Sequence, residues 1–212
     1  QDPRGLRTAP AQGDAAGKVG AVDDNVLVSK ERGLAVITVE IADEVRDVVR
    51  SVEAHDLAGQ YGVLFGNEEQ KRKYLAPAAT GDMIFSYALT EPQTGSDAQN
   101  IKTSATESED GRHFILNGTK TYITNANYAG GLTVFAQMEP ARPGYMGAFI
   151  VETEWEGVKI GKDMPKMGLK ASSTAAIRFN NVKVPRENLL GRPGDGFKIA
   201  MVILNYGRMA LG

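Results

Sequence analysis

The sequence predicts an α+β protein, with N-terminal helices, a middle antiparallel β-barrel or sandwich domain, and the start of a C-terminal helical bundle. Three observations support this fold class. Apolar residues recur at helical spacing before residue 82, they alternate with polar residues in short runs after it, and the segment from Phe197 to Leu211 is almost wholly apolar. Short alternating runs separated by turn residues are typical of antiparallel sheets.

Residues 1–35 are predicted to form a flexible tail. The first 25 residues are rich in Ala, Gly, Pro and Asp and contain almost no large apolar side chain. Such a segment cannot bury enough surface to offset the entropy lost on ordering. Because the chain begins with Gln1 and not with Met, we expect it to be processed or to be a fragment of a longer protein.

Residues 36–82 are predicted to be a helical N-terminal part. Three helices are expected, at Ile41–Ala54, at residues 57–65 and at Glu68–Leu75. Gly66 is suited to end the second helix. Asn67, with Gln70 three residues later, forms a capping-box pattern for the third helix, which is expected to end before Pro77.

Residues 83–190 are predicted to be the β-domain, and residues 191–212 the first helix of a truncated C-terminal helical domain. The expected strands are Ile84–Leu89, Thr103–Glu107, His113–Leu116, Tyr122–Asn125, Leu132–Met138, Ala148–Glu152, Val158–Ile160 and Ala176–Val184. A loop is expected at Gly191–Gly196, and a helix, buried on most sides, at Phe197–Leu211.

Composition excludes several classes of function. The 212 residues carry a formal net charge of -2, which gives no basic excess for nucleic acid. The absence of cysteine excludes disulfides, thiolate catalysis and Cys-ligated metals. No metal site is expected from His55 and His113, because they fall in segments assigned to different layers. No apolar run reaches the length of a membrane span, and the common nucleotide-binding glycine motifs are missing.

The most informative stretch runs from Tyr87 to Asp97 and reads Tyr-Ala-Leu-Thr-Glu-Pro-Gln-Thr-Gly-Ser-Asp. Pro92 ends the preceding strand because it has no N–H to donate. Gly95 permits a positive φ or a close backbone approach to a ligand, and Ser96 adds a hydroxyl to the N–H groups of the turn. This turn is therefore able to bind an anion.

A second stretch, Lys-Thr-Tyr-Ile-Thr-Asn from Lys120 to Asn125, also ends a predicted strand. Alternation places Tyr122 and Thr124 on one face and Ile123 on the other. One face then offers an aromatic wall and a hydroxyl. Each stretch alone has the features of an ordinary turn after a strand, so the functional interpretation depends on the combined pattern.

The combined pattern resembles the acyl-CoA dehydrogenase family of flavoproteins. It reads Tyr-x-x-Thr-Glu-Pro-x-x-Gly-Ser-Asp, followed about thirty residues later by Asn-Gly-x-Lys-x-Tyr-Ile-Thr-Asn. The resemblance extends from about Ala54 to Gly212 and is closest to the long-chain and very-long-chain branch. It includes three further stretches, at Leu64–Leu75, Lys166–Thr174 and Gly194–Arg208.

The resemblance implies a cofactor, FAD, held at the strand ends of the β-domain. The positions that match the family's cofactor contacts are Tyr87, Leu89, Thr90, Gly95, Ser96, Tyr122, Ile123 and Thr124. By that match Thr90 and Thr124 hydrogen-bond the edge of the isoalloxazine, with Thr124 near N5, and Tyr122 packs on the ring. Gly95 and Ser96 lie near the pyrophosphate, and Ser96 also contacts the acyl-CoA.

The resemblance further implies the α,β-dehydrogenation of an acyl-CoA thioester in fatty acid or amino acid catabolism. A glutamate removes the α-proton, the β-hydrogen leaves as hydride to flavin N5, and the electrons pass to an electron-transfer flavoprotein. The positions that match substrate contacts are Ser96, Asn205, Tyr206, Gly207 and Arg208. The family implies a homo-oligomer when complete, in the cytoplasm of a bacterium or in the mitochondrial matrix of a eukaryote.

The catalytic glutamate is where the sequence departs from the family. Some members carry it directly before the arginine that Arg208 matches, but Gly207 stands there, and others carry it further downstream. No catalytic residue is therefore assigned. Two alternatives stay open: an acyl-CoA oxidase or other flavin oxidase or monooxygenase of the same fold, and a non-catalytic β-domain that serves as an interaction module.

Overall fold

The structure is a computed structural model that describes residues 26–31, 34–39, 64–139, 142–168 and 172–211, with the side chains of the last helix described as far as Asn205. The predicted helix at Ile41–Ala54 and most of the one at residues 57–65 lie outside the described residues. The predicted domain boundaries stay predictions.

Two strands occupy part of the predicted tail. β1 (Val26–Glu31) pairs antiparallel with β2 (Leu34–Val39), from Val26 opposite Val39 to Glu31 opposite Leu34. The prediction of a flexible tail as far as residue 35 is therefore wrong for these residues. The β-branched residues of both segments favour extended structure, and the composition of the preceding 25 residues concealed that signal.

The predicted third helix forms with the expected cap. Its segments are α2 (Glu68–Gln70), the π-helical turn η3 (Lys71–Leu75) and α3 (Ala76–Ala79). The amide of Gln70 donates to Asn67 Oδ1 at 2.8 Å, and the amide of Asn67 donates to Gln70 Oε1 at 2.9 Å, which confirms the capping box. The predicted end before Pro77 is wrong. The π-helical turn changes the hydrogen-bond pattern just before Pro77, so a residue without an N–H is accommodated.

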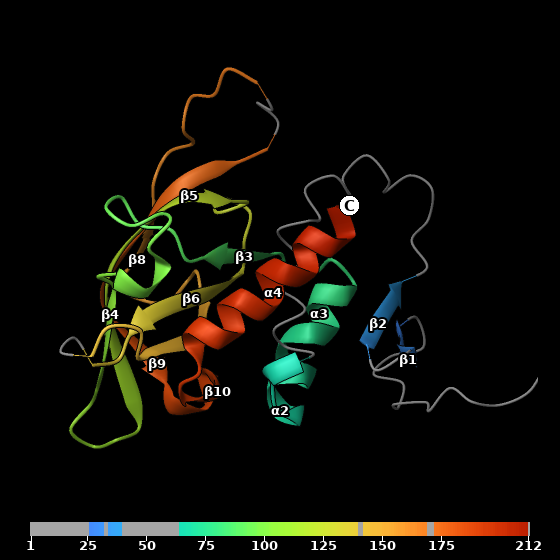
Figure 1. Ribbon diagram of the computed structural model, residues 1–212, viewed down its shortest axis with the longest axis horizontal. Coiled ribbons are helices and arrows are strands. Elements are labelled where there is room, and N and C mark those ends of the chain that lie inside the picture. Colours follow the sequence, from blue (N-terminus) through green and yellow to red (C-terminus); the bar gives the residue numbers. More distant parts are fainter. Residues whose placement is uncertain (1–25, 32–33, 40–63, 140–141, 169–171, 212) are drawn as a thin grey trace, which may run out of the picture.

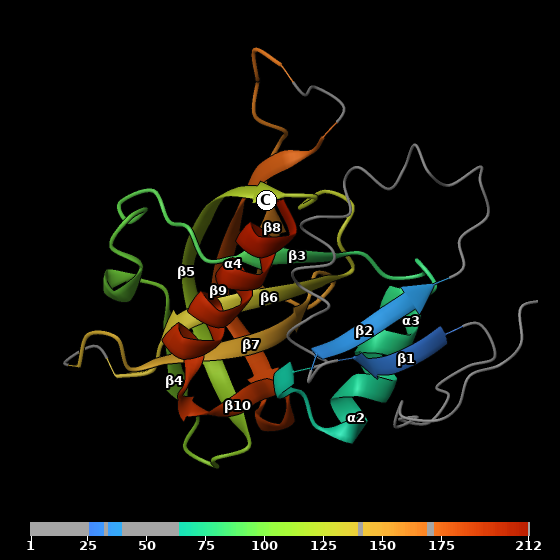
Figure 2. The same cartoon turned by 45° about the vertical axis from the view of Figure 1, so that its right-hand side comes forward.

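The β-domain is an eight-stranded sheet in the order β10-β7-β6-β4-β5-β9-β8, with β3 paired to β6 (Figures 1 and 2). The strands are β3 (Phe85–Ala88), β4 (Ser104–Glu107), β5 (His113–Thr124), β6 (Gly131–Gln137), β7 (Met146–Glu152), β8 (Val158–Ile160), β9 (Thr174–Pro185) and β10 (Leu189–Gly194). Most neighbours are antiparallel, as predicted, but β3 and β4 both run parallel to β6. The sheet is therefore mixed.

Two strand assignments differ from the prediction. The expected strands at His113–Leu116 and Tyr122–Asn125 are one continuous strand, β5, whose register against β9 shifts twice and thereby accommodates the intervening residues. The loop expected at Gly191–Gly196 is largely strand β10, which pairs with β7 across an irregular register. Its glycines, Gly191 at φ 66° and Gly194 at φ 91°, hid the strand because they are typical of turns.

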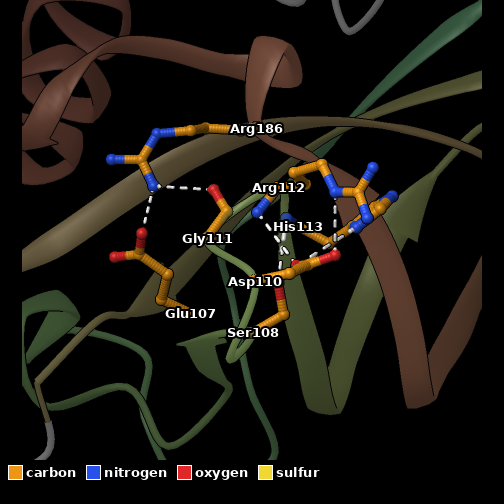
Figure 3. A network of polar contacts seen from close by, with 7 residues as sticks. All are labelled: Glu107, Ser108, Asp110, Gly111, Arg112, His113 and Arg186. Atoms are coloured by element: carbon orange, nitrogen blue, oxygen red, sulfur yellow. Dashed lines mark hydrogen bonds and ion pairs between the residues drawn. The ribbon is translucent and has the colours of Figure 1, made fainter.

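The β4–β5 hairpin is held by a polar network at the surface (Figure 3). Asp110 accepts hydrogen bonds from the Ser108 hydroxyl at 2.6 Å and from the amide and Nε of Arg112 at 3.1 and 2.9 Å. These bonds lower the pKa of Asp110 to about 2. Arg186, which follows β9, forms an ion pair with Glu107 and donates to the carbonyl of Gly111. The network joins the hairpin to the end of β9.

The helices cover one side of the sheet, and a hydrophobic core lies between them and the strands. α4 (Gly196–Leu211) lies on β7, β10 and β6, with α3 beside it (Figures 1 and 2). This confirms the predicted C-terminal helix. The core beneath contains Tyr74, Phe85, Leu89, Phe135, Met146, Ile150, Ile199 and Ile203, among others. A separate core, with Phe114, Leu116, Phe149, Ile177 and Val182, lies within the β-domain.

The start of α4 is fixed by a backbone contact. A Cβ atom placed on Gly196 would lie 2.7 Å from the carbonyl carbon of Gly147 in β7. Only glycine allows an approach this close. Asp195 also forms a bridge with Met146. The sheet therefore sets both the position and the direction of the helix.

The helix formed by α2, η3 and α3 is anchored to the sheet by side chains of the Leu64–Leu75 stretch. Gln70 Nε2 donates to the carbonyls of Glu187 and Leu189, at 2.6 and 3.0 Å. The Tyr74 hydroxyl donates to Glu152 Oε1 and accepts from Asn188 Nδ2, both at 2.9 Å. Polar residues of this charged helix thus hold it against β7 and β10.

Candidate functional site

The two motif stretches lie side by side where β3 ends. The amide of Thr121 donates to the carbonyl of Thr90 at 2.9 Å. The hydroxyl of Ser86, in β3, donates to the carbonyl of Thr124 at 2.7 Å. Sequence segments about thirty residues apart are thus joined by direct hydrogen bonds, and Thr90 and Thr124 belong to one local region of the fold.

A β-bulge in β5 shapes the second stretch. Lys120 pairs with Ile177, and Ile123 pairs with Ala175, so β5 carries one more residue than β9 between these pairs. Tyr122 has a φ of 57°, a left-handed conformation that is costly for a non-glycine residue. Its side chain is 69% exposed, whereas Ile123 is buried. The bulge therefore directs an aromatic side chain toward solvent at the strand end.

The first stretch continues into a tight turn. The amide of Glu91 donates to the carbonyl of Thr94 at 3.1 Å, and the amide of Thr94 donates to the carbonyl of Glu91 at 3.2 Å. Gly95 and Ser96 follow and are exposed. Gly95 does not have the positive φ that we considered, but a Cβ atom built on it meets nothing within 4 Å. The space above Gly95 is therefore open to a ligand.

A buried ion pair connects the two stretches, and the sequence did not lead us to it. Lys120 Nζ lies 2.8 Å from Glu91 Oε1 and 3.0 Å from the carbonyl oxygen of Leu89, and neither charged side chain is exposed. The Glu91 carboxylate also accepts from the amides of Lys102 at 2.6 Å and Thr103 at 2.9 Å. The signal in the sequence was one acidic and one basic residue, Glu91 and Lys120, each within one of the two motif stretches.

Both members of this pair are charged at neutral pH. Burial lowers the pKa of Lys120 to about 8, although the Glu91 carboxylate opposes that effect. Burial raises the pKa of Glu91, but the charge of Lys120 and the hydrogen bonds that Glu91 accepts outweigh it, so the pKa lies below its ordinary value. The mutual attraction of the two groups therefore keeps the ionised pair intact inside the protein.

A third segment, before and at the start of β9, borders the region. Thr174 is the register partner of Thr124. Asp163 accepts from the Ser173 hydroxyl at 2.7 Å and from Asn127 Nδ2 at 2.8 Å, and these bonds lower its pKa. Lys166 donates to Thr174 Oγ1 at 3.0 Å. Part of the Lys166–Thr174 stretch thus lies next to the end of β5, which the sequence alone did not indicate.

The remaining predicted residues are distributed between this region and the core. Leu89 is buried in the core that also contains Ile199 and Ile203 of α4. Tyr87 is half-buried, and its ring centroid lies 5.2 Å from that of Phe135. Asn205 is exposed on α4, and the same helix continues through Tyr206, Gly207 and Arg208. The predicted substrate positions other than Ser96 therefore lie on a helix that packs on the same core as the end of β3.

The exposed groups are of the chemical kinds that bind a large heterocycle with phosphates. Tyr122 offers a ring, while Thr90, Ser96 and Thr124 are exposed or half-buried and offer hydroxyls. Such neutral donors hold and tune a flavin without a competing charge. In the described part of the chain no cluster of three metal-ligating side chains occurs. None of the helices described there has the length and apolarity that a membrane span requires.

Comparison with known proteins gives a consistent result. Residues 86–182 match the profile of the acyl-CoA dehydrogenase middle domain. The chain is 45% identical over 165 residues to the mitochondrial very long-chain specific acyl-CoA dehydrogenase of Macaca fascicularis. The aligned residues make up 74% of this chain and 25% of that protein. It is 48% identical over 149 residues to a probable acyl-CoA dehydrogenase of Bacillus subtilis, covering 70% and 25%. The chain thus spans about a quarter of the length of these relatives.

Solved structures share the fold as well. Butyryl-CoA dehydrogenase from Megasphaera elsdenii is 40% identical with a TM-score of 0.73, covering 76% of this chain and 42% of that one. An acyl-CoA dehydrogenase complexed with FAD, from Bacillus anthracis, is 45% identical with a TM-score of 0.71, covering 75% and 27%. The prolyl acyl carrier protein oxidase AnaB is 34% identical with a TM-score of 0.73, covering 76% and 43%.

Proposed function

The chain belongs to the acyl-CoA dehydrogenase family, and from this premise we propose that it carries the flavin-binding β-domain of an FAD-dependent acyl-CoA dehydrogenase. The observation that carries the proposal is the direct joining of the two motif stretches at the end of β3, through the Thr121–Thr90 hydrogen bond. The substrate is an acyl-CoA thioester and the electron acceptor an electron-transfer flavoprotein. The complete protein is a homo-oligomer, located in the cytoplasm or in the mitochondrial matrix according to its host.

Residues of this chain hold FAD in three groups. Thr90, through its hydroxyl and backbone N–H, and Thr124 would donate to the edge of the isoalloxazine, and Tyr122 would pack on its face. Gly95 and Ser96 lie close to the pyrophosphate, where the open space above Gly95 permits a close backbone approach. Tyr87, Leu89 and Ile123 complete the set, and the burial of Leu89 and Ile123 leaves their backbone groups to make the contact.

When bound, FAD supplies the acceptor for a hydride from the acyl β-carbon. The protein's contribution is positional. The helix from Asn205 to Arg208 contacts the thioester, and Ser96 contacts the acyl-CoA from the turn. Gly207, and not a glutamate, stands directly before Arg208, so the group that removes the α-proton is assigned to none of these residues.

The proposal is tested by adding FAD to the purified chain and measuring flavin fluorescence and visible absorbance after removal of free FAD. We expect a bound flavin with a shifted, structured absorbance band. Thr124→Val is expected to weaken binding, whereas Thr106→Val, on an exposed position of β4, is the matched control and leaves it unchanged. A chain that retains no flavin at saturating FAD would contradict the proposal and favour the non-catalytic interaction module.

An oxidase of the same fold is the second candidate, because the chain is 34% identical to an acyl carrier protein oxidase. The two functions differ in how fast the reduced flavin reacts with O₂. Reoxidation of the photoreduced, FAD-loaded chain is measured after mixing with O₂. A dehydrogenase is reoxidised slowly without its acceptor protein, and rapid reoxidation would identify the oxidase.

A further inference from the structure

The buried pair of Lys120 and Glu91 is an unusual feature that the proposed function has not yet used. Two charges without solvent contact are costly, and replacing such a pair with apolar residues is often neutral or stabilising. Stability alone therefore does not explain its presence. Its location is informative, because Lys120 bonds to the carbonyl of Leu89, which is assigned to FAD, and Glu91 bonds to backbone amides at the end of the loop that contains Gly95 and Ser96.

Glu91 closes the loop that contains Gly95 and Ser96. Its backbone makes both hydrogen bonds of the turn with Thr94, at the start of the loop. Its carboxylate accepts the amides of Lys102 and Thr103, at the end of the loop. One residue thus holds both ends of the segment that is assigned to the pyrophosphate.

Lys120 contacts or borders the remaining segments assigned to FAD, at Leu89–Thr90 and at Tyr122. Its ammonium donates to the carbonyl of Leu89 at 3.0 Å, and the N–H of that same peptide unit belongs to Thr90. A positive donor on the carbonyl polarises the peptide and strengthens its N–H as a donor. Lys120 also stands at the beginning of the bulge that presents Tyr122.

We propose that Lys120 and Glu91 are positioning residues for the flavin: Glu91 sets the shape of the pyrophosphate loop, while Lys120 fixes Thr90 against the Tyr122 bulge and polarises the Leu89–Thr90 peptide. This inference rests on the proposed function. It adds a role for two residues that make no contact with the cofactor themselves.

The test compares Lys120→Met, Glu91→Gln and the double variant Glu91→Gln/Lys120→Met with the parent chain. Three quantities are measured for each: the midpoint of thermal unfolding, the Kd for FAD, and the reduction potential of the bound flavin. Glu107→Gln is the matched control, because it breaks an ion pair with Arg186 at the surface hairpin, away from the motif stretches.

The double variant separates positioning from stability. Each single variant leaves one buried group without its partner, so its unfolding midpoint falls, whereas the double variant recovers most of that loss because no charge stays buried. We nevertheless expect the double variant to bind FAD about tenfold more weakly, the loss that corresponds to one charge-assisted hydrogen bond. Its bound flavin is expected to have a more negative potential, because a weaker Thr90 donor stabilises the reduced ring less. Glu107→Gln leaves Kd and potential unchanged.

A double variant with the parent's Kd and potential would overturn the inference and leave the proposed function standing. A parent chain that binds no FAD would overturn both. If a single variant fails to fold, the double variant still decides between these outcomes.

Discussion

Lys120 Nζ lies 2.8 Å from Glu91 Oε1, and both side chains are completely buried. The two residues belong to different motif stretches, and each also bonds to the backbone of a neighbouring segment. Ionised groups are rarely found in such positions unless they are paired. The pair therefore links three segments directly: the end of β3, the bulge of β5 and the loop before β4.

Removal of one partner is expected to destabilise the fold strongly. In Lys120→Met the Glu91 carboxylate stays buried without a compensating charge, although it still accepts from the amides of Lys102 and Thr103 and from Gln93 Nε2. We expect this change to cost roughly 3–5 kcal/mol. Urea unfolding measures the change. Glu107→Gln breaks an ion pair whose side chains are half exposed, so it should cost less than about 1 kcal/mol. Equal losses for the two variants would mean that the buried pair has no special weight.

The left-handed conformation of Tyr122 is expected to separate stability from binding. Tyr122→Gly and Tyr122→Val both remove the ring, but only glycine adopts a φ of 57° without strain. We expect Tyr122→Val to be roughly 1–2 kcal/mol less stable than Tyr122→Gly. Both variants should bind FAD more weakly than the parent. Identical unfolding curves for the two variants would argue against strain at this position.

The β4–β5 hairpin is expected to confer an acid-sensitive component of stability. The pKa of Asp110 is lowered to about 2 in the folded chain, so between its ordinary value and pH 2 the unfolded chain binds the extra proton. The contribution is therefore complete above about pH 5 and is lost as the pH falls toward 2.

Asp110→Asn removes this carboxylate but keeps a side chain of similar size (Figure 3). The stability difference between parent and variant, measured by urea unfolding at several pH values, should be constant above about pH 5 and shrink toward pH 2. A difference that grows as the pH falls would show that the sign is wrong.

The backbone contact at the start of α4 is expected to make Gly196 sensitive to the smallest substitution. The added methyl of Gly196→Ala would lie 2.7 Å from the carbonyl carbon of Gly147, so the helix must shift, at a cost of about 1–3 kcal/mol. Gly168→Ala is the control, because a Cβ atom there meets nothing within 4 Å. Thermal unfolding compares the two, and equal midpoints would contradict the close packing of α4.

Regular features of the fold were predictable because they depend on local patterns. The capping box at Asn67 and Gln70, the alternating strands and the apolar helix α4 each follow from residues within one segment. The parallel pairing of β3 with β6 and the pairing of β10 with β7 were not predicted. Both depend on partners far away in the sequence, which a local pattern does not specify.

The candidate site was predictable in its motifs but not in its support. Hydroxyls at strand ends identify Thr90 and Thr124, and the structure brings their segments together. Glu91 and Lys120 escaped notice because a charged residue near a turn is normally solvated. Lys120 also stands at the start of the bulge at Tyr122, and an alternating sequence gives no sign of an extra residue.

The bulge of β5 also determines how this region is able to change over evolutionary time. Deletion of one residue between Lys120 and Ile123 would leave equal numbers of residues in β5 and β9 between these pairs, and so would remove the bulge that presents Tyr122. Point replacements leave that count intact, and so the ligand preference of the strand can drift. The spacing between Lys120 and Thr124 is therefore expected to be far more constant among descendants of this chain than the identity of the residues between them.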